Sequence, residues 1–378
     1  MQTFKSYDIK IFFKSRHLMK YIIITQTFPP RTGGMQTVMT AIAKRLSTLE
    51  KTIVFPDHFV SKDNDISKEN FSIYNNFTPK LFRSFVKKLL AYQTIENEDI
   101  IICDSWKSIN AVPNIANKII VLAHGQEYLS SNKKYDLIKK SLTRANHIIC
   151  SSKYTYDLIE SLKITDTNKS IIPPTYSLEK INKRLEIKTF KSSNKVHIIS
   201  ITRLEERKGI IPVLKSLGAL KKSKSLKPFI WDIFGIGDQK DEIEEVIKAL
   251  NLAQYVKLKG AITNKDKEYY LSIADLFIMP SYKVEKSIEG FGISYVEAAA
   301  YSIPSIAGQE GGVTDAVLDK KTGWCVNPMN QKQLSKVLLE AINNNKKREL
   351  LGRQAQEEFL NSFVGEKVFR KFMKSIHS

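Results

Sequence analysis

Short apolar runs alternate with helical patterns along nearly the whole chain. This alternation is typical of βαβ units, which build parallel sheets. Between the first two runs, apolar residues from Met35 to Leu49 recur every three or four positions, which predicts a helix. We expect strands at 21–25, 52–55, 99–103, 119–123, 147–151 and 170–172, and again at 196–201, 229–234, 255–258, 276–279 and 305–307.

The two sets of elements predict an α/β protein with two Rossmann-like domains facing an interdomain cleft. A chain of 378 residues is too long for one ordinary core. In such folds the ligand lies outside the carboxyl ends of the strands. We expect a first domain over 1–180, with 1–18 as either an extension or a misassigned start, a linker over 181–194, a second domain over 195–355, and a C-terminal helix over 356–378 returning towards the first domain.

The net charge of +20 adds a possible class of partner but does not decide the function. The excess is +14 over residues 1–200, with 31 basic and 17 acidic residues, and +6 over 201–378, with 28 and 22. Such a field attracts nucleic acid or an anionic membrane, although an AT-rich genome also produces Lys- and Ile-rich proteins. A nucleic-acid-binding protein is thus an alternative that only charge supports, because no RNP-like strand, helix-turn-helix signal or zinc spacing accompanies it. We expect no nucleic acid partner.

Apolar runs and cysteines indicate the compartment. No apolar run reaches 18 residues, so we expect no membrane-spanning helix, and the basic N-terminus lacks the clean apolar core of a secretion signal. Cys103, Cys150 and Cys325 lie far apart in or near apolar runs, the pattern of buried thiols in a reducing environment. We therefore expect a cytoplasmic protein.

A basic loop follows the strand at 196–201. Arg203, Lys208 and Gly209 precede a helical pattern, and a guanidinium with an ammonium at a strand's carboxyl end suits a diphosphate. A solvated charged turn is an equally good interpretation of this loop taken alone.

The sharpest constellation is a pair of glutamates, Glu289 and Glu297, around Phe291, Gly292 and Ile293. A helix that starts near Gly292 aims its free N–H groups at an anion. Positions eight apart do not share a helical face, so one carboxylate in the loop and one in the helix would let both reach one ligand. Because carboxylates repel phosphate, we expect them to accept hydrogen bonds from hydroxyl groups, one from ribose and one from a sugar.

Two strand-end loops in the first half give weaker signals. Gly33 and Gly34 open a helix, where backbone can approach a phosphate or an acceptor. His124 and Gly125 follow a strand, although a lone histidine is more often structural than catalytic. The turn at 235–238 has only half of a dinucleotide fingerprint, so we do not expect an NAD site.

From about Met19 to the C-terminus, these motifs resemble the GT-B glycosyltransferases of family 4. The resemblance rests on the E-x7-E pair, the Gly33-Gly34 loop, His124-Gly125, Arg203 with Lys208-Gly209, Asp275 and Gly311-Gly312-Val313. It implies that Arg203 and Lys208 bind the donor diphosphate and that Glu297 holds the ribose. It also implies that Glu289 and the backbone of Phe291, Gly292 and Ile293 hold the sugar, which His124 helps to position.

The implied function is a retaining, metal-independent hexosyltransferase that moves a sugar from a nucleotide-sugar to a glycan or lipid-linked acceptor, in cell-surface polysaccharide or glycolipid synthesis. Arg203, Lys208 and a helix N-terminus suffice to stabilise the departing diphosphate. The nucleotide-sugar is a co-substrate, and no cofactor or metal is expected. Asp63 and Asp65 spell a D-x-D metal motif, but no apolar strand precedes them, which favours a chance match.

Two points leave alternatives open. Many relatives carry Pro and Glu after Gly-Gly-Val, whereas this chain has Thr314 and Asp315, which leaves the donor sugar undetermined. A nucleotide-sugar epimerase of the same fold is the second alternative, although it needs acid and base groups around the sugar and only His124 presents itself.

The segment 80–90 predicts an amphipathic helix in the half with most of the charge. Leu81, Phe82, Phe85 and Leu89 form its apolar stripe, and Arg83, Lys87 and Lys88 lie outside it. This is the pattern of an interfacial helix on an anionic membrane, on the acceptor side of the enzyme. A helix that packs on its own domain with a solvated basic face fits equally well. The first interpretation implies peripheral attachment to the inner face of the membrane.

Overall fold

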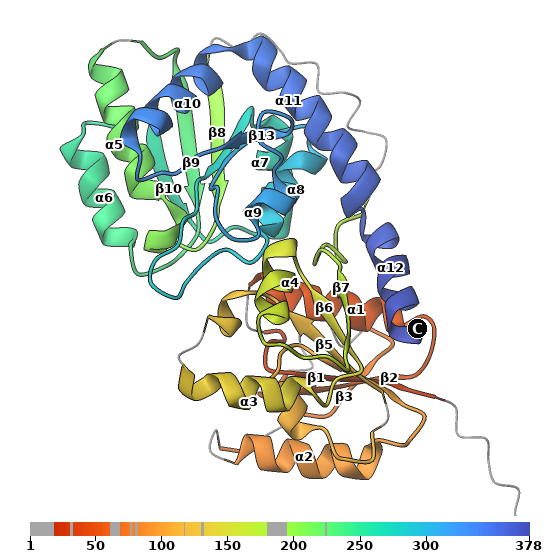
Figure 1. Cartoon of the computed structure of the whole chain (residues 1–378). Helices are drawn as coiled ribbons and strands as arrows, with labels where there is room; N and C mark the ends of the chain where they lie inside the picture. Colours follow the sequence, from red (N-terminus) through yellow and green to blue (C-terminus); the bar gives the residue numbers. More distant parts are fainter. Residues whose placement is uncertain are drawn as a thin grey trace, which may run out of the picture.

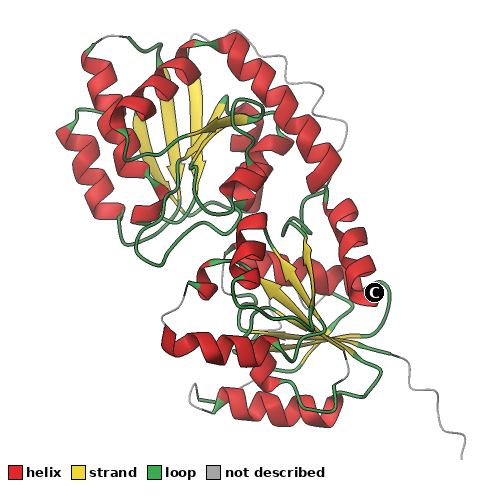
Figure 2. Cartoon of the chain, in the orientation of Figure 1, coloured by secondary structure: helices red, strands yellow, loops and turns green. Residues whose placement is uncertain are grey.

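The computed structural model describes residues 19–378 except 31–32, 61–68, 76–77, 80–81, 117, 130–131, 180–194 and 224. The expectations for the extension at 1–18, the linker at 181–194 and the D-x-D motif at 63–65 lie outside the described residues. Within them the chain forms two α/β domains, each with a parallel sheet between helices, as predicted (Figures 1 and 2).

The first domain has a seven-stranded parallel sheet in the order β3-β2-β1-β4-β5-β6-β7. Its inner strands are nearly continuous apolar runs because helices cover both faces, whereas the edge strands β3 and β7 are short or polar. They are β1 (Tyr21–Thr25), β2 (Thr52–Pro56), β3 (Ser72–Ile73), β4 (Ile100–Cys103), β5 (Lys118–Ala123), β6 (His147–Cys150) and β7 (Asn168–Ile171).

Helices on the two faces of this sheet bury separate apolar clusters. One face packs against α1 and α12, and the other against α2, η2, α3 and α4. Leu49, which the periodicity assigned to the buried stripe of α1, is 51% exposed because that helix ends at Ser47. The helices are α1 (Gly34–Ser47), α2 (Arg83–Thr94), η2 (Ser108–Ala111), η3 (Gln126–Tyr128), α3 (Asn132–Leu142) and α4 (Lys153–Glu160).

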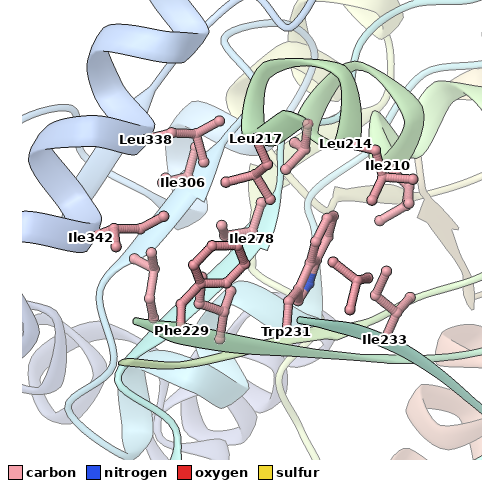
Figure 3. Packing of buried hydrophobic residues seen from close by; sticks show 14 of the residues in the cluster. Ile210, Leu214, Leu217, Phe229, Trp231, Ile233, Ile278, Ile306, Leu338 and Ile342 are labelled. Carbon is pink, nitrogen blue, oxygen red and sulfur yellow. The ribbon is translucent and has the colours of Figure 1, made fainter. Parts of the chain in front are cut away.

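The second domain repeats this plan with six parallel strands in the order β10-β9-β8-β11-β12-β13. Trp231 on β9 is fully buried against α5, and residues of α10 complete the same hydrophobic cluster (Figure 3). The strands are β8 (Val196–Ile201), β9 (Phe229–Phe234), β10 (Val256–Gly260), β11 (Leu276–Met279), β12 (Ser305–Ala307) and β13 (Gly323–Cys325). The helices are η4 (Glu206–Lys208), α5 (Ile210–Lys222), α6 (Lys240–Ala249), α7 (Asn264–Ile273), α8 (Ile293–Ala300), α9 (Val313–Ala316), α10 (Gln331–Asn343) and α11 (Asn345–Glu358).

The last helix leaves the second domain and packs on the first. After a π-helical turn, η5 (Phe359–Phe363), helix α12 (Gly365–His377) buries Val368, Phe372 and Ile376 against the core around α1 (Figure 1). In each sheet the strand order reverses beside the first strand, between β1 and β4 and between β8 and β11. Ligands of open α/β sheets bind at such switch points, so the candidate site is sought at these carboxyl ends.

Candidate active site

The loop after β8 carries three cations in different environments. Arg207 and Lys208 lie in η4 and are only 5% and 7% exposed, whereas the Arg203 side chain is 62% exposed and pairs with Glu205. Lys208 is followed by Gly209, whose backbone is left-handed, with φ of 73°, and approaches the carbonyl of Pro280 too closely for a side chain. The sequence prediction selected Arg203 and missed Arg207, because nothing in the sequence shows which arginine turns inward.

Glu289 accepts hydrogen bonds from both buried cations. Its Oε2 lies 2.8 Å from Nη1 of Arg207 and also pairs with Nζ of Lys208. Burial would raise the pKa of Glu289, but the charges of Lys208 and Arg207 outweigh it and hold the pKa at about 2. Burial lowers the pKa of Lys208 despite the nearby carboxylate. Arg207 has a second carboxylate partner, because its Nε lies 3.1 Å from Oε2 of Glu205. With Arg203 included, three cations face the two carboxylates of Glu205 and Glu289, which leaves a net positive charge.

The loop from Glu289 to Gly292 makes a close contact between the two domains. A Cβ at Gly290 would overlap the carbonyl oxygen of His124 in the first domain, so only glycine fits. Gly292 has φ of 93° and forms the N-cap of α8, so the helix starts where the sequence predicts it. The first N–H groups of a helix have no partner within it, which makes such a start a suitable place for an anion. The Phe291 side chain is buried in the second domain, which leaves only its backbone for a ligand.

Glu297 lies one turn into α8 and has a different partner. Its Oε1 lies 2.6 Å from Nζ of Lys267 on α7, and the two side chains are 16% and 26% exposed. Lys267 is a second residue that the sequence reasoning missed, since a lysine in a charged helix carries no distinguishing signal. The two carboxylates of the pair therefore bind separate cations, one on each side of the start of α8.

The first domain faces this helix with the start of α1. A Cβ at Gly34 would lie 3.6 Å from Cδ1 of Ile293, so the N-termini of α1 and α8 approach each other. Gly33 is the N-cap of α1, with φ of 151° and no capping side chain. The structure thus brings Gly33, Gly34 and Ile293 together at two helix N-termini, where partial positive charge accumulates.

His124 lies at the end of β5, beside Gly290. Burial lowers the pKa of its imidazole below the ordinary value of 6.5, against the opposing effect of Glu127, so the ring is mainly neutral at pH 7. Its buried Nε2 has no hydrogen-bond partner among the described residues. A small cavity of about 10 Å³ adjoins it, lined also by Ser151 and Tyr176.

Asp104, at the end of β4, organises the loop between β1 and α1. Its Oδ2 accepts hydrogen bonds from the Thr25 hydroxyl at 2.8 Å, from the Gln26 N–H at 2.7 Å and from Thr27. Oδ1 accepts from the Ser108 hydroxyl at 2.6 Å. The sequence reasoning missed this residue, although a carboxylate at a buried strand's end beside the switch point was a usable signal.

A cleft of about 400 Å³ opens between the domains beside Arg207. The turn at 235–238, set aside as a dinucleotide motif, forms part of its wall. The cleft is lined by Gln126, Arg203, Glu205, Arg207, Ile236, Gly237, Asp238, Val284 and Ser287. The described residues contain no group of three or more side chains able to hold a metal ion.

Asp315 has a role across the domain boundary. Its Oδ2 lies 2.6 Å from the backbone nitrogen of Lys153, the first residue of α4 in the first domain. Nearby, a Cβ at Gly312 would lie 2.6 Å from Oγ of Ser152. The position at which the sequence departs from the expected Pro-Glu pattern thus contacts the opposite domain.

In the helix expected at 80–90, the predicted position of Lys87 is wrong. Lys87, expected on the outer face, is 3% exposed and pairs with Asp57. It turns inward because Asp57 follows β2, and its Nζ also lies 3.4 Å from the carbonyl oxygen of Thr25. Lys88 is exposed and Arg83 half-buried. No helix in the described part of the chain has the length and apolar character needed to cross a bilayer.

Two parallel Rossmann-like domains meet beside buried cations and a pair of carboxylates. Residues 182–358 match the family model "Glycosyl transferases group 1". The chain is 23% identical over 327 residues to a GDP-mannose-dependent alpha-(1-6)-phosphatidylinositol monomannoside mannosyltransferase of Mycolicibacterium smegmatis, covering 81% of this chain and 85% of that protein. It is 26% identical over 364 residues to the uncharacterized glycosyltransferase MJ1178 of Methanocaldococcus jannaschii, covering 92% and 95%.

The solved structure of Alr3699/HepE of Anabaena with UDP and glucose has the same fold. Its TM-score is 0.76 at 17% identity, over 95% of this chain and 100% of that one. The chain is a glycosyltransferase with the GT-B fold, and its residues 182–358 are similar to the glycosyl transferases of group 1.

Proposed function

We propose that this glycosyltransferase belongs to family 4 and is a retaining, metal-independent hexosyltransferase. It moves a hexose from a nucleotide-diphosphate sugar to a glycan or lipid-linked acceptor, in the synthesis of cell-surface polysaccharide or glycolipid. The observation that carries this proposal is Glu289, which two buried cations hold at the start of α8 beside the cleft.

The charges suggest a role for each group. Lys208, Arg203 and the N–H groups at the start of α8 bind the diphosphate and stabilise the charge that grows on it as the glycosidic bond breaks. Glu289, ionised because its pKa is about 2, accepts hydrogen bonds from the sugar hydroxyls. Glu297 accepts hydrogen bonds from the ribose hydroxyls, which replace its ion pair with Lys267. His124, neutral at pH 7, positions the sugar near the reacting carbon.

The same arrangement supports attack from the face that the diphosphate leaves. The acceptor oxygen bonds to the anomeric carbon as the bond to the diphosphate oxygen breaks, and a phosphate oxygen takes the acceptor proton. The configuration is then retained, and no protein base is required. The relatives named for GDP-mannose and the Anabaena structure with UDP support a nucleotide-linked donor.

A donor screen tests this proposal. Purified protein is mixed with UDP-, GDP- and ADP-sugars, and the melting temperature is measured with and without a chelator. We expect one class of nucleotide-sugar to raise the melting temperature by the same amount with and without the chelator. Stabilisation that the chelator abolishes would contradict metal independence.

The product of the identified donor then tests the reaction. With an acceptor, NMR of the new linkage should show the anomeric configuration of the donor, and an inverted product would contradict retention. Without an acceptor, we expect slow hydrolysis at most. Conversion to a different nucleotide-sugar would instead identify an epimerase.

A further inference from the structure

Helix α2 presents four large apolar side chains to solvent. Phe82, which precedes its first residue, and Phe85, Leu89 and Tyr92 are 56%, 71%, 50% and 59% exposed; we call these four the α2 ridge. Their spacing of three, four and three places them on one stripe of the helix. The opposite side packs inward through Ala91 and Lys87, so this stripe is not the one that the core uses.

Basic side chains border the α2 ridge. Lys88 is exposed beside it, and α2 contains no acidic residue. Helix α3, which like α2 packs against η2, exposes Lys134 and Lys140, with Asp136 as an exposed acid (Figure 1). On α2 the ridge thus has basic and no acidic neighbours, although the exposed Glu98 follows the helix, and both helices lie in the half of the chain that carries most of the charge excess.

We propose that the α2 ridge docks on an anionic lipid bilayer, inserting its apolar side chains into the interfacial layer while Lys88, Lys134 and Lys140 contact headgroup phosphates. Phenylalanine and tyrosine suit this layer because one end of it is apolar and the other is hydrated. Each lysine near an anionic surface adds to the attraction. The protein then lies peripherally on the inner face of the membrane, with its acceptor-side domain towards the lipid.

The shape of the surface favours a bilayer over a second protein. Stable protein interfaces bury about 800 Å² per partner with roughly 20–30 residues. The α2 ridge is one line of four side chains on a single helix and offers no groove. A membrane requires neither a groove nor a matching surface, only apolar groups at one depth with cations beside them.

The test is cosedimentation of the full chain with vesicles of phosphatidylcholine, with or without phosphatidylglycerol, at physiological salt. Leu89→Ser and Phe85→Ser remove apolar side chains from the ridge. Leu350→Ser is the matched control, because Leu350 on α11 of the second domain is 51% exposed, against 50% for Leu89. Unchanged melting temperatures ensure that each variant is folded.

We expect binding to the anionic vesicles, about tenfold weaker for Phe85→Ser and unchanged for Leu350→Ser. Lys134→Gln with Lys140→Gln should reduce the preference for phosphatidylglycerol and the dependence on salt. The proposal is overturned if folded wild-type protein ignores the vesicles or if Phe85→Ser binds as well as Leu350→Ser. It is also overturned if Phe85→Ser converts a dimer to a monomer without changing vesicle binding.

Discussion

Around the start of α8 the two domains face each other with different chemistry, and we call these facing sides the two walls. The wall from the second domain is charged, with Arg207 and Lys208 on Glu289 and with Lys267 on Glu297. The wall from the first domain is mainly backbone and neutral side chains, with Gly33 and Gly34 at a helix start and His124 mainly neutral at pH 7. In the function proposed above, the charged wall binds the donor, whereas the neutral wall only approaches it closely. Substitutions in the charged wall should therefore have the larger effects.

Removing the ammonium of Lys208 should have the largest effect. Lys208→Met keeps most of the side-chain volume but removes a charge that stabilises the leaving diphosphate, so we expect kcat/KM to fall about 10³-fold. Steady-state kinetics with the identified donor measures this change. Lys222→Met, an exposed lysine at the end of α5, is the control and should change little. A similar loss in both variants would show that general charge, not this wall, governs activity.

Glu289→Gln should affect stability as well as activity. It leaves the buried Lys208 without its carboxylate and leaves Arg207 with Glu205 alone, and we expect the free energy of unfolding at pH 7 to fall by about 2–3 kcal/mol. Denaturant unfolding measures the loss.

The pH dependence checks the cause of that loss. The pKa of Glu289 is lowered in the folded protein from 4.5 to about 2. Its ionic contribution is therefore complete above pH 4.5 and is lost as the pH falls towards 2. The difference between wild type and Glu289→Gln should shrink over this range. A difference that stays constant would indicate a packing defect in place of a lost ion pair.

Glu297→Ala should have a smaller effect, confined to donor binding. One ribose contact is lost and Lys267 is left without its carboxylate, so we expect donor affinity to fall about tenfold, as measured by calorimetry. Lys267→Met tests the other partner: if Lys267 competes with the ribose for Glu297, this variant should bind the donor at least as tightly as wild type. Unchanged affinity in Glu297→Ala would remove Glu297 from the ribose role.

The contrast between the walls also explains what sequence could predict. Strands with continuous apolar runs, such as β1, β8 and β11, begin and end at the predicted residues, whereas β3 and β13, of two and three residues, were not predicted. The glutamate pair was found because glycines mark its loop. The ion-pair partners of such residues could not be predicted. Glu289 pairs with a residue 82 positions away, and Lys87 turns inward to a residue 30 positions away. Such pairings depend on how the sheets bring loops together.

Asp315 joins the two walls, and its removal should have the smallest effect. Its carboxylate accepts a hydrogen bond from the Lys153 N–H at the start of α4, a favourable place for a negative charge. The bond is exposed to solvent, so we expect Asp315→Ala to raise the KM for the donor only about threefold, with kcat nearly unchanged. Small-angle scattering without donor should show a larger radius of gyration if the bond helps to hold the domains together. Asp315→Asn keeps an acceptor without the charge and should lie between wild type and Asp315→Ala. A large fall in kcat for Asp315→Ala would instead place this residue at the reacting sugar, on the charged wall and not between the two.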